Sequence, residues 1–122
     1  MRGVVVTDYV VIFPADDEAE WEAGTEADHQ ATFDTDHEFA QLLQARGGAV
    51  IGGAGLAHSR TARTIKRGSG SKPVITDGPF AETVEQISGF FIVTCDDYDA
   101  LVEAAQVLVR AHPVVEIRPV EE

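Results

Sequence analysis

The segment GFFIVTCDDYDALVEAAQVL, residues 89–108, joins an apolar run to an acidic pair and then to a helical pattern. Residues 89–95 form a continuous apolar stretch of strand length, which predicts a strand in the core of the sheet. Asp96 or Asp97 then predicts a helix N-cap, and Asp99 places a carboxylate in the first turn, where it favours the helix dipole. The helix carries apolar side chains at helical spacing, at Leu101, Ala104, Ala105 and Leu108.

The first half of the chain has the same strand-and-helix order. Residues 3–13 alternate β-branched and aromatic side chains, which favours a strand, and Pro14 ends it because proline cannot donate to a sheet ladder. Residues 25–46 predict a helix whose apolar stripe holds Phe39, Leu42 and Leu43. Glycines 47 and 48 favour a helix stop, since glycine accepts the left-handed C-cap conformation. Residues 49–57 (AVIGGAGLA) predict a glycine-rich strand with a bulge or a close backbone approach.

Two further features complete the order of elements. Residues 61–67 and 72–76 flank the sequence GSGS and predict a hairpin, and residues 114–118 predict a closing strand. The resulting order is strand, helix, strand, hairpin, strand, helix, strand. This order predicts an α+β fold of the split βαβ type (βαβ-hairpin-βαβ, the ferredoxin-like plait), with both helices on one face of an antiparallel sheet.

The other face of that sheet would be left without cover. Its strands are too apolar to stay in contact with water, and an exposed apolar patch of that size usually marks an interface. We therefore expect a homodimer that packs sheet against sheet.

The length, composition and net charge of the chain indicate a globular protein. A length of 122 residues predicts one domain spanning residues 1–122, with 44% hydrophobic and 25% charged residues. The mean hydropathy of −0.04 argues against a membrane protein. The net charge of −12 disfavours nucleic-acid or anionic-membrane partners.

Two features of the sequence bear on its cellular location. The apolar start of the chain is interpreted as a strand rather than a targeting segment, and the single Cys95 fits a reducing compartment. A cytoplasmic location is therefore expected.

The common cofactor and nucleophile motifs are absent from the sequence. It contains no Walker loop, no G-x-G-x-x-G after a strand, no H-E-x-x-H, no C-x-x-C and no G-x-S-x-G elbow. The four histidines lack compact metal-ligand spacing. We therefore expect no cofactor and no metal, and Cys95 is interpreted as a core thiol.

The stretch TDGPFAETVEQ, residues 76–86, predicts a tight turn that carries acidic groups. Asp77 can bond its own downstream backbone, Gly78 can adopt positive φ, and Pro79 presets φ. Phe80 can anchor the turn in the core or shield a cleft. A lone Asp-Gly-Pro turn commonly connects two secondary-structure elements without any functional role, so the turn by itself does not establish a site.

The turn nevertheless belongs to a longer pattern, which resembles the YCII-related (DGPF-domain) proteins. The matching pieces span nearly the whole chain and are VITDGPFAETVEQ (74–86), GFFIV (89–93), VEIRPV (115–120), FAQLLQARG (39–47) and GGAGL (52–56). The resemblance implies a ferredoxin-like plait that dimerises into an α+β barrel. It also implies a His–Asp pair in the cleft as an acid–base element. Some relatives lie beside extracytoplasmic-function sigma factors, which gives a regulatory alternative.

Two histidines are candidates for that pair. The family position falls on His37 if Gly48 is aligned with the family's helix-end glycine, and on Asp36 if Phe39, Leu43 and Gly47 set the register. On a helical wheel Asp36 lies about 60° from Phe39, whereas His37 lies about 160° away and would face solvent. His29 lies about 80° away, near the side of Asp36. The resemblance thus favours His37 and the geometry favours His29.

Three functional hypotheses follow. In the first, a histidine and Asp77 transfer protons on a small organic substrate, with an anion among the candidates, in a cleft of the dimeric barrel. In this role Asp77 would be buried, and Gly78, Pro79, Phe80, Glu82 and Arg118 would contact the ligand. The second is a non-catalytic ligand-binding or regulatory module. The third makes the turn a purely structural folding corner at the dimer edge; in that case Arg118 would simply pair with Glu82 or Glu116.

Overall fold

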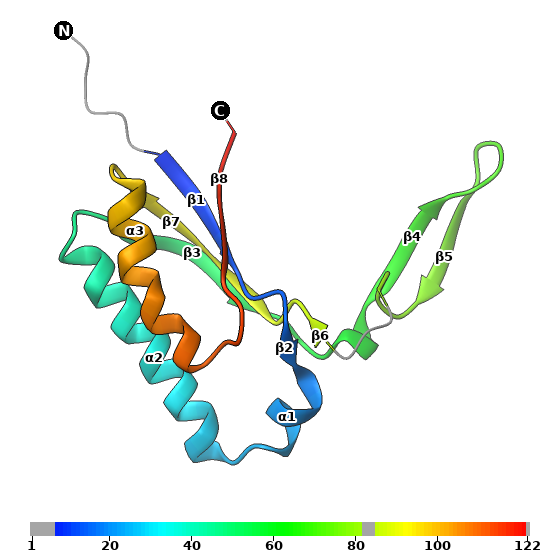
Figure 1. The fold of residues 1–122 in the computed structure, drawn as a ribbon. Helices are drawn as coiled ribbons and strands as arrows, with labels where there is room; N and C mark the ends of the chain where they lie inside the picture. The colour runs from blue at the N-terminus through cyan, green and yellow to red at the C-terminus, as the bar shows by residue number, and fades with distance from the viewer. Residues whose placement is uncertain (1–6, 82–84, 122) are drawn as a thin grey trace, which may run out of the picture.

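The apolar strand at residues 89–95 lies inside an antiparallel sheet in the computed structural model, which describes residues 7–81 and 85–121. This strand, β7 (Gly89–Cys95), pairs with β1 (Thr7–Ile12) on one side and with β3 (Ala49–Gly55) on the other. The fourth strand, β8 (Glu116–Pro119), pairs with β1, so the order is β3-β7-β1-β8 (Figure 1). The chain is therefore an α+β protein with antiparallel sheets.

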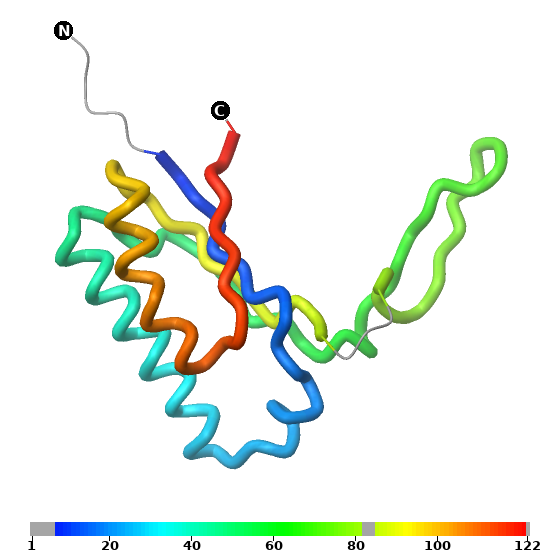
Figure 2. Tube along the Cα trace, in the orientation of Figure 1, coloured from blue at the N-terminus to red at the C-terminus, as the bar shows by residue number. Residues whose placement is uncertain are grey.

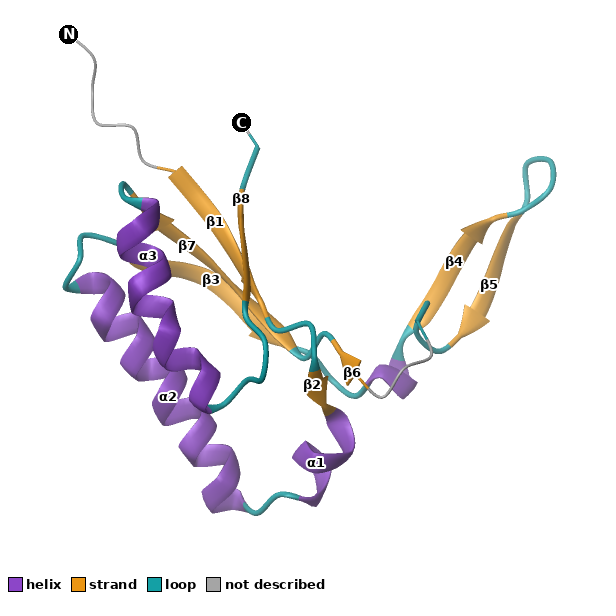
Figure 3. Cartoon of the chain, viewed as in Figure 1, coloured by secondary structure: helices purple, strands orange, loops and turns teal. Residues whose placement is uncertain are grey.

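Two helical segments cover one face of this sheet (Figures 1 and 3). The helix α2 (Glu26–Gln44) begins with a capping box, because Thr25 and Asp28 each accept a hydrogen bond from the other's backbone N–H. It ends before Gly47, whose φ of +84° is the left-handed conformation predicted for this stop. The second segment is α3 (Tyr98–Ala105), capped by Asp97 and continued by the 3-10 helix η2 (Gln106–Arg110).

The core lies between the helices and the sheet. Phe39 and Leu43 of α2 are fully buried, as the stripe predicts, and Leu42 packs at the margin of the core. In the described part of the chain, the other hydrophobic core side chains are Tyr9, Val11, Phe13, Val93, Cys95, Leu101, Ala104, Ala105, Val107 and Leu108. The Cys95 thiol is therefore part of the core, as predicted.

The glycine-rich strand β3 has the expected irregularity. Its register with β7 shifts between Val50 and Gly52, which is a β-bulge. Gly53 has a φ of +140°, and a Cβ there would overlap the carbonyl oxygen of Phe90. Only a residue without a side chain fits this close approach to β7.

A long hairpin leaves the body of the domain at the end of β3. It consists of β4 (Arg63–Arg67) and β5 (Pro73–Asp77), which pair antiparallel as predicted. Figures 1 and 2 show this hairpin extending away from the sheet, on the side opposite α2 and α3. The smaller elements lie at the same end of the sheet and are β2 (Asp16–Asp17), α1 (Glu18–Ala23), η1 (Ser59–Thr61) and β6 (Glu85–Gln86).

Some element bounds differ from those expected. The strand β3 ends at Gly55, because Ser88 N–H donates to the carbonyl of Phe13 rather than to β3, although Leu56 N–H still donates to the carbonyl of Ser88. The strand β8 begins at Glu116 rather than at residue 114, because the chain must first cross from η2 to the sheet. Residues 3–6 of the first predicted strand lie outside the described residues.

The helices within residues 7–81 and 85–121 do not meet the requirements of a bilayer-spanning segment. None of them combines the necessary length and hydrophobicity.

Candidate functional site

His112 occupies a buried position just after η2. Its backbone N–H donates to the carbonyl of Leu108, so it extends the apolar stripe of the preceding helix by one more turn. The residue is only 5% exposed. A titratable ring at this depth needs partners, because burying a polar group without hydrogen bonds is costly.

Both ring nitrogens of His112 contact carboxylates. Nδ1 lies 2.9 Å from Oδ2 of Asp16, and Nε2 lies 3.1 Å from Oδ1 of Asp36. Asp16 is in β2, directly after the chain leaves β1, and Asp36 is in α2. Three segments that are distant in sequence therefore converge on one imidazole. We call Asp16, His112 and Asp36 the histidine–aspartate centre.

The two carboxylates control the charge of the ring. Burial by itself lowers the pKa of His112, but the hydrogen bonds and negative charges of Asp16 and Asp36 outweigh it and raise the pKa from 6.5 to about 9. The ring is therefore an imidazolium at neutral pH, and each N–H donates to one carboxylate.

Neighbouring groups hold the centre in place. The ring of Phe13 stacks on the imidazole with 3.7 Å between centroids and an interplanar angle of 9°. The hydroxyl of Ser88 donates to Oδ2 of Asp16. The other oxygen of that carboxylate, Oδ1, is buried and has no hydrogen-bond partner among the described residues. Asp16 is thus anchored through one oxygen, while the other keeps its capacity to accept a hydrogen bond.

A cleft of about 1330 Å³ lies beside the centre, and Phe13, Asp16, Asp36 and His112 are part of its wall. It opens between the N-terminal half of α2, α1 and the end of the sheet where β3 and β7 meet. Seven acidic side chains line the cleft, against two arginines. Both arginines are paired: Arg60 with Glu22 at 2.7 Å and Arg110 with Glu38 at 3.1 Å. The cleft is therefore electronegative.

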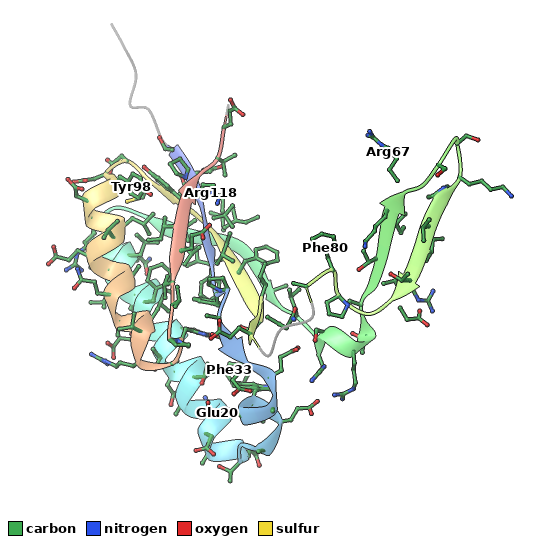
Figure 4. The ribbon with its side chains drawn as sticks, turned by 45° about the vertical axis from the view of Figure 1, so that its right-hand side comes forward. Glu20, Phe33, Arg67, Phe80, Tyr98 and Arg118 are labelled. Atoms are coloured by element: carbon green, nitrogen blue, oxygen red, sulfur yellow. The ribbon has the colours of Figure 1, made fainter. Side chains whose placement is uncertain are left out.

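Aromatic side chains form the far wall of the cleft. Trp21 of α1 stacks on His29 of α2, with 3.9 Å between ring centroids, and contacts Phe33 edge to face. His29 Nε2 also lies 2.7 Å from the carbonyl oxygen of Trp21, which accepts its hydrogen bond. Figure 4 shows Phe33 beside α1, at the lower end of the molecule. His29 thus lines the cleft, where it fastens α1 to α2.

The structure does not place His37 in this cleft. It is exposed on α2, as the helical wheel indicated, while its neighbour Asp36 faces the cleft. The second alignment register, which puts Asp36 at the family position, therefore agrees with the geometry.

The structure places the predicted turn on the hairpin, away from the cleft. The burial expected for Asp77 is not found in the chain: its side chain is 95% exposed, and its carboxylate lies 3.9 Å from Arg63. Gly78 has the positive φ expected of it, at +100°, and Pro79 is half-buried. Phe80 is 79% exposed, with the Lys66 ammonium 5.4 Å from its ring centroid, so it does not anchor the turn in the core of this chain.

Arg118, another predicted ligand contact, is not among the residues that line the cleft. Arg118 pairs with Glu116 at 2.9 Å, which is one of the two pairings foreseen for it. Glu82 lies outside the described residues. Of the two histidines nominated from the sequence, His29 is the one that lines the cleft.

Sequence reasoning missed His112 and Asp16. A signal for His112 was present, because it follows Leu101 and Leu108 at the helical spacing of the buried stripe. Asp16 offered no comparable signal, since it is one of many acids in its region. In the described part of the chain, no group of three histidine, cysteine or acidic side chains is arranged to hold a metal ion.

Comparison with known proteins agrees with the resemblance drawn from the DGPF turn. Over 62 residues the chain is 39% identical to an uncharacterized protein of Rhizobium meliloti (strain 1021), a match that covers 48% of this chain and 50% of the relative. The matched segment thus spans about half the length of that relative. A family model described as the YCII-related domain matches residues 7–122. The chain therefore belongs to the YCII-related domain family.

Proposed function

We propose that this protein is a small-molecule enzyme that performs acid–base chemistry at the histidine–aspartate centre. The observation that carries the proposal is the convergence of two carboxylates on one buried imidazole at the wall of a large cleft. Sites of this kind, apolar with a few convergent polar groups and a perturbed pKa, are typical of small-molecule binding and catalysis. The His–Asp chemistry expected from the sequence is kept, and its residues become His112, Asp16 and Asp36.

The three residues would have different roles. Asp36 is the proposed proton acceptor, because one oxygen of Asp16 is already occupied by His112 and Ser88 and the other is buried. A substrate C–H or O–H would give its proton to the Asp36 carboxylate and retain the electron pair. The His112 imidazolium would stabilise the resulting negative charge at short range. Asp16 and Ser88 would hold the imidazole in orientation.

The charge of the cleft supports a neutral or cationic substrate rather than the anionic one suggested by sequence. Acidic side chains outnumber arginines in the lining by seven to two, and both lining arginines are already paired. An anion would be repelled by this field, whereas an amine or a neutral carbonyl compound would not. The rings of Trp21 and Phe33 add aromatic surface against which such a molecule can pack.

Proton exchange with solvent tests this function across whole classes of compound, so the substrate itself need not be identified first. Candidate neutral ketones, lactones and aminoketones are incubated with the protein in D2O, and loss of their acidic C–H signals is followed by proton NMR. We expect catalysed exchange with at least one class, and a loss on the order of 10²-fold or more in Asp36→Asn. The matched control is Asp34→Asn, because Asp34 lies two residues earlier in α2 and is exposed to solvent. Equal exchange rates in the two variants would remove Asp36 from the mechanism.

A non-catalytic ligand-binding module is the second candidate, and one observation favours it. Both nitrogens of His112 are occupied by carboxylates, so neither is free to exchange a proton with a ligand directly. Asp77, the carboxylate expected to act with a histidine, is also absent from the described lining of the cleft. Binding of a molecule at the cleft, seen as amide chemical-shift changes near Phe13 and Asp36, without any accelerated exchange would support this alternative.

The same proposal includes a homodimer of ferredoxin-like plaits that forms an α+β barrel. Support comes from the strand order β3-β7-β1-β8 and from helices on one face only. On the other face, Val10, Ile12, Phe90 and Ile92 remain partly exposed, alternating in β1 with buried Tyr9 and Val11. Sedimentation analysis should give twice the chain mass of 13.1 kDa. Val10→Glu should dissociate the dimer, whereas Val102→Glu on the outer side of α3, where Val102 is 43% exposed, should not.

A further inference from the structure

The β4–β5 hairpin carries an apolar surface that nothing in the described part of its own chain covers. Ile65 and Ile75 are direct cross-strand partners, so they lie on the same face of the hairpin. They are 68% and 63% exposed, and Val74 on the opposite face is 49% exposed. Residues in a solvated hairpin are usually polar, so paired isoleucines at this exposure indicate a contact surface.

The hairpin is also a poor candidate for an independent element. An isolated two-stranded hairpin is marginally stable at best in water, and three or more strands or a covering layer are normally needed. Yet the figures show β4 and β5 extending away from the body, with Phe80 between the hairpin and the sheet and Arg67 near the hairpin's outer end (Figures 3 and 4). A second protein surface packed against the hairpin would bury its exposed isoleucines and stabilise it.

The charge of the hairpin identifies the kind of surface that fits. Residues 63–77 contain four of the nine basic residues of the chain and one of its 21 acidic residues. On the face of the isoleucine pair, Arg63 and Arg67 flank Ile65 at two-residue spacing. The remainder of the chain holds twenty acidic residues and five basic ones. A second copy of this chain therefore offers the complementary charge.

We infer that the β4–β5 hairpin is an arm that packs against a second copy of this chain, with the Ile65–Ile75 pair at the centre of the contact and arginines around it. The inference rests on the proposed homodimer and adds an interface distinct from the bare sheet face. In a two-fold dimer the contact occurs twice, once for each arm. It would also bring the turn at residues 77–80 of one copy against the other copy, which gives the predicted turn residues a place between subunits.

Charge reversal within the arm provides the first test. Arg67→Glu changes an exposed arginine of β4, and Arg46→Glu changes an exposed arginine at the end of α2 with the same effect on net charge. We expect Arg67→Glu to weaken dimerisation at least fivefold at low ionic strength, and less at high salt, because the contact is screened. Arg46→Glu should leave the dissociation constant within twofold of the unmodified chain.

Cross-linking from the hairpin tip provides the second test. Ser69→Cys introduces an exposed thiol at the tip, while the native Cys95 is buried, so a photoreactive group can be attached selectively. Equal amounts of ¹⁴N- and ¹⁵N-labelled chains are mixed, irradiated and digested. Cross-linked peptides that join one light and one heavy segment would show that the arm contacts another copy.

The possible outcomes of these two tests distinguish the arm contact from the sheet-face dimer and from the proposed enzymatic activity. A dimer that forms with unchanged affinity in Arg67→Glu and yields only same-chain cross-links overturns the arm and leaves the sheet-face dimer standing. A protein that sediments as a monomer at all concentrations overturns both. Neither result bears on proton exchange at Asp36, which is measured separately.

Discussion

Nε2 of His112 lies 3.1 Å from Oδ1 of Asp36, although 76 residues separate them in the sequence. On the other side of the ring, Nδ1 meets Asp16 across 96 residues. An imidazolium between two carboxylates in a nearly dry setting is stabilised by both charges, provided that both remain ionised. This arrangement makes the stability of the fold depend on the protonation of one histidine.

The first prediction concerns stability against pH. The pKa of His112 is about 9 in the folded protein and near its ordinary value of 6.5 in the unfolded chain. The stabilisation is therefore fully present below pH 6.5 and is lost as the pH rises to about 9, because in that window the folded state binds more protons. The loss should approach about 3 kcal/mol, at about 1.4 kcal/mol per pH unit. Urea denaturation at several pH values measures it.

The matched variants for this prediction are His112→Gln and His37→Gln. His112→Gln should flatten the decline between pH 6.5 and 9, while His37→Gln, which alters an exposed histidine, should preserve it. If the free energy of unfolding of the unmodified chain and of His112→Gln falls in parallel across this window, the pH dependence does not come from His112.

The second prediction concerns Asp36. Asp36→Asn removes one of the two negative charges on the ring, so the pKa of His112 should fall by about 1 unit or more. The free energy of unfolding at neutral pH should fall by about 1–3 kcal/mol, because the Nε2–H then faces a weaker partner. An NMR titration of the labelled imidazole measures the first effect. Asp34→Asn, which removes only an exposed contact with Gln30, is expected to change neither quantity appreciably.

The third prediction concerns Gly53 of β3. A Cβ at this position would overlap the carbonyl oxygen of Phe90 and lie 2.9 Å from Cα of Phe91, and φ is +140°. Gly53→Ala should therefore destabilise the fold by about 2 kcal/mol or more, measured by chemical denaturation. Gly55→Ala is the control in the same strand, since a Cβ there meets nothing within 4 Å. Similar losses in both variants would show that the close approach to β7 is relaxed in solution.

The fourth prediction concerns Cys95. Its thiol is 1% exposed and contacts the carbonyl oxygen of Asp97 at 3.3 Å. Reaction with an aromatic disulfide reagent should be on the order of 10² times slower than in denaturant, because the thiol reacts only when the structure opens. Ser69→Cys supplies an exposed thiol in the same chain for comparison. Rapid modification of native Cys95 would show that the core around β7 opens readily.

The elements of this fold could be predicted because their signals are local. The run at residues 89–95 is β7 with the predicted bounds, Asp97 caps α3, and Gly47 follows the end of α2. Each signal depends on a few neighbouring residues and on the hydrogen-bonding needs of one helix or strand end. The family could be recognised from the DGPF turn for the same reason: the pattern is continuous in sequence.

The location of the candidate site beside His112 could not be predicted in this way. The DGPF turn was nominated because it gathers unusual residues that are continuous in sequence, and in this chain Asp77 is exposed on a hairpin that extends away from the sheet. His112 was not nominated from the sequence, and it is buried between two carboxylates. Helical spacing did place Asp36 on the flank of the buried stripe, which agrees with its position in the wall of the cleft.

The four strands of the main sheet, the two helical segments that cover it and the family resemblance could be read from the sequence alone, because short-range periodicity, capping and a continuous motif carry them. That β2, α2 and the end of η2 meet at one point, in the wall of a cleft that carries seven acidic side chains, is a property of the folded chain. The physical reason is that the pKa of a buried histidine depends on distances between atoms of remote segments, and those distances exist only after the helices pack on the sheet.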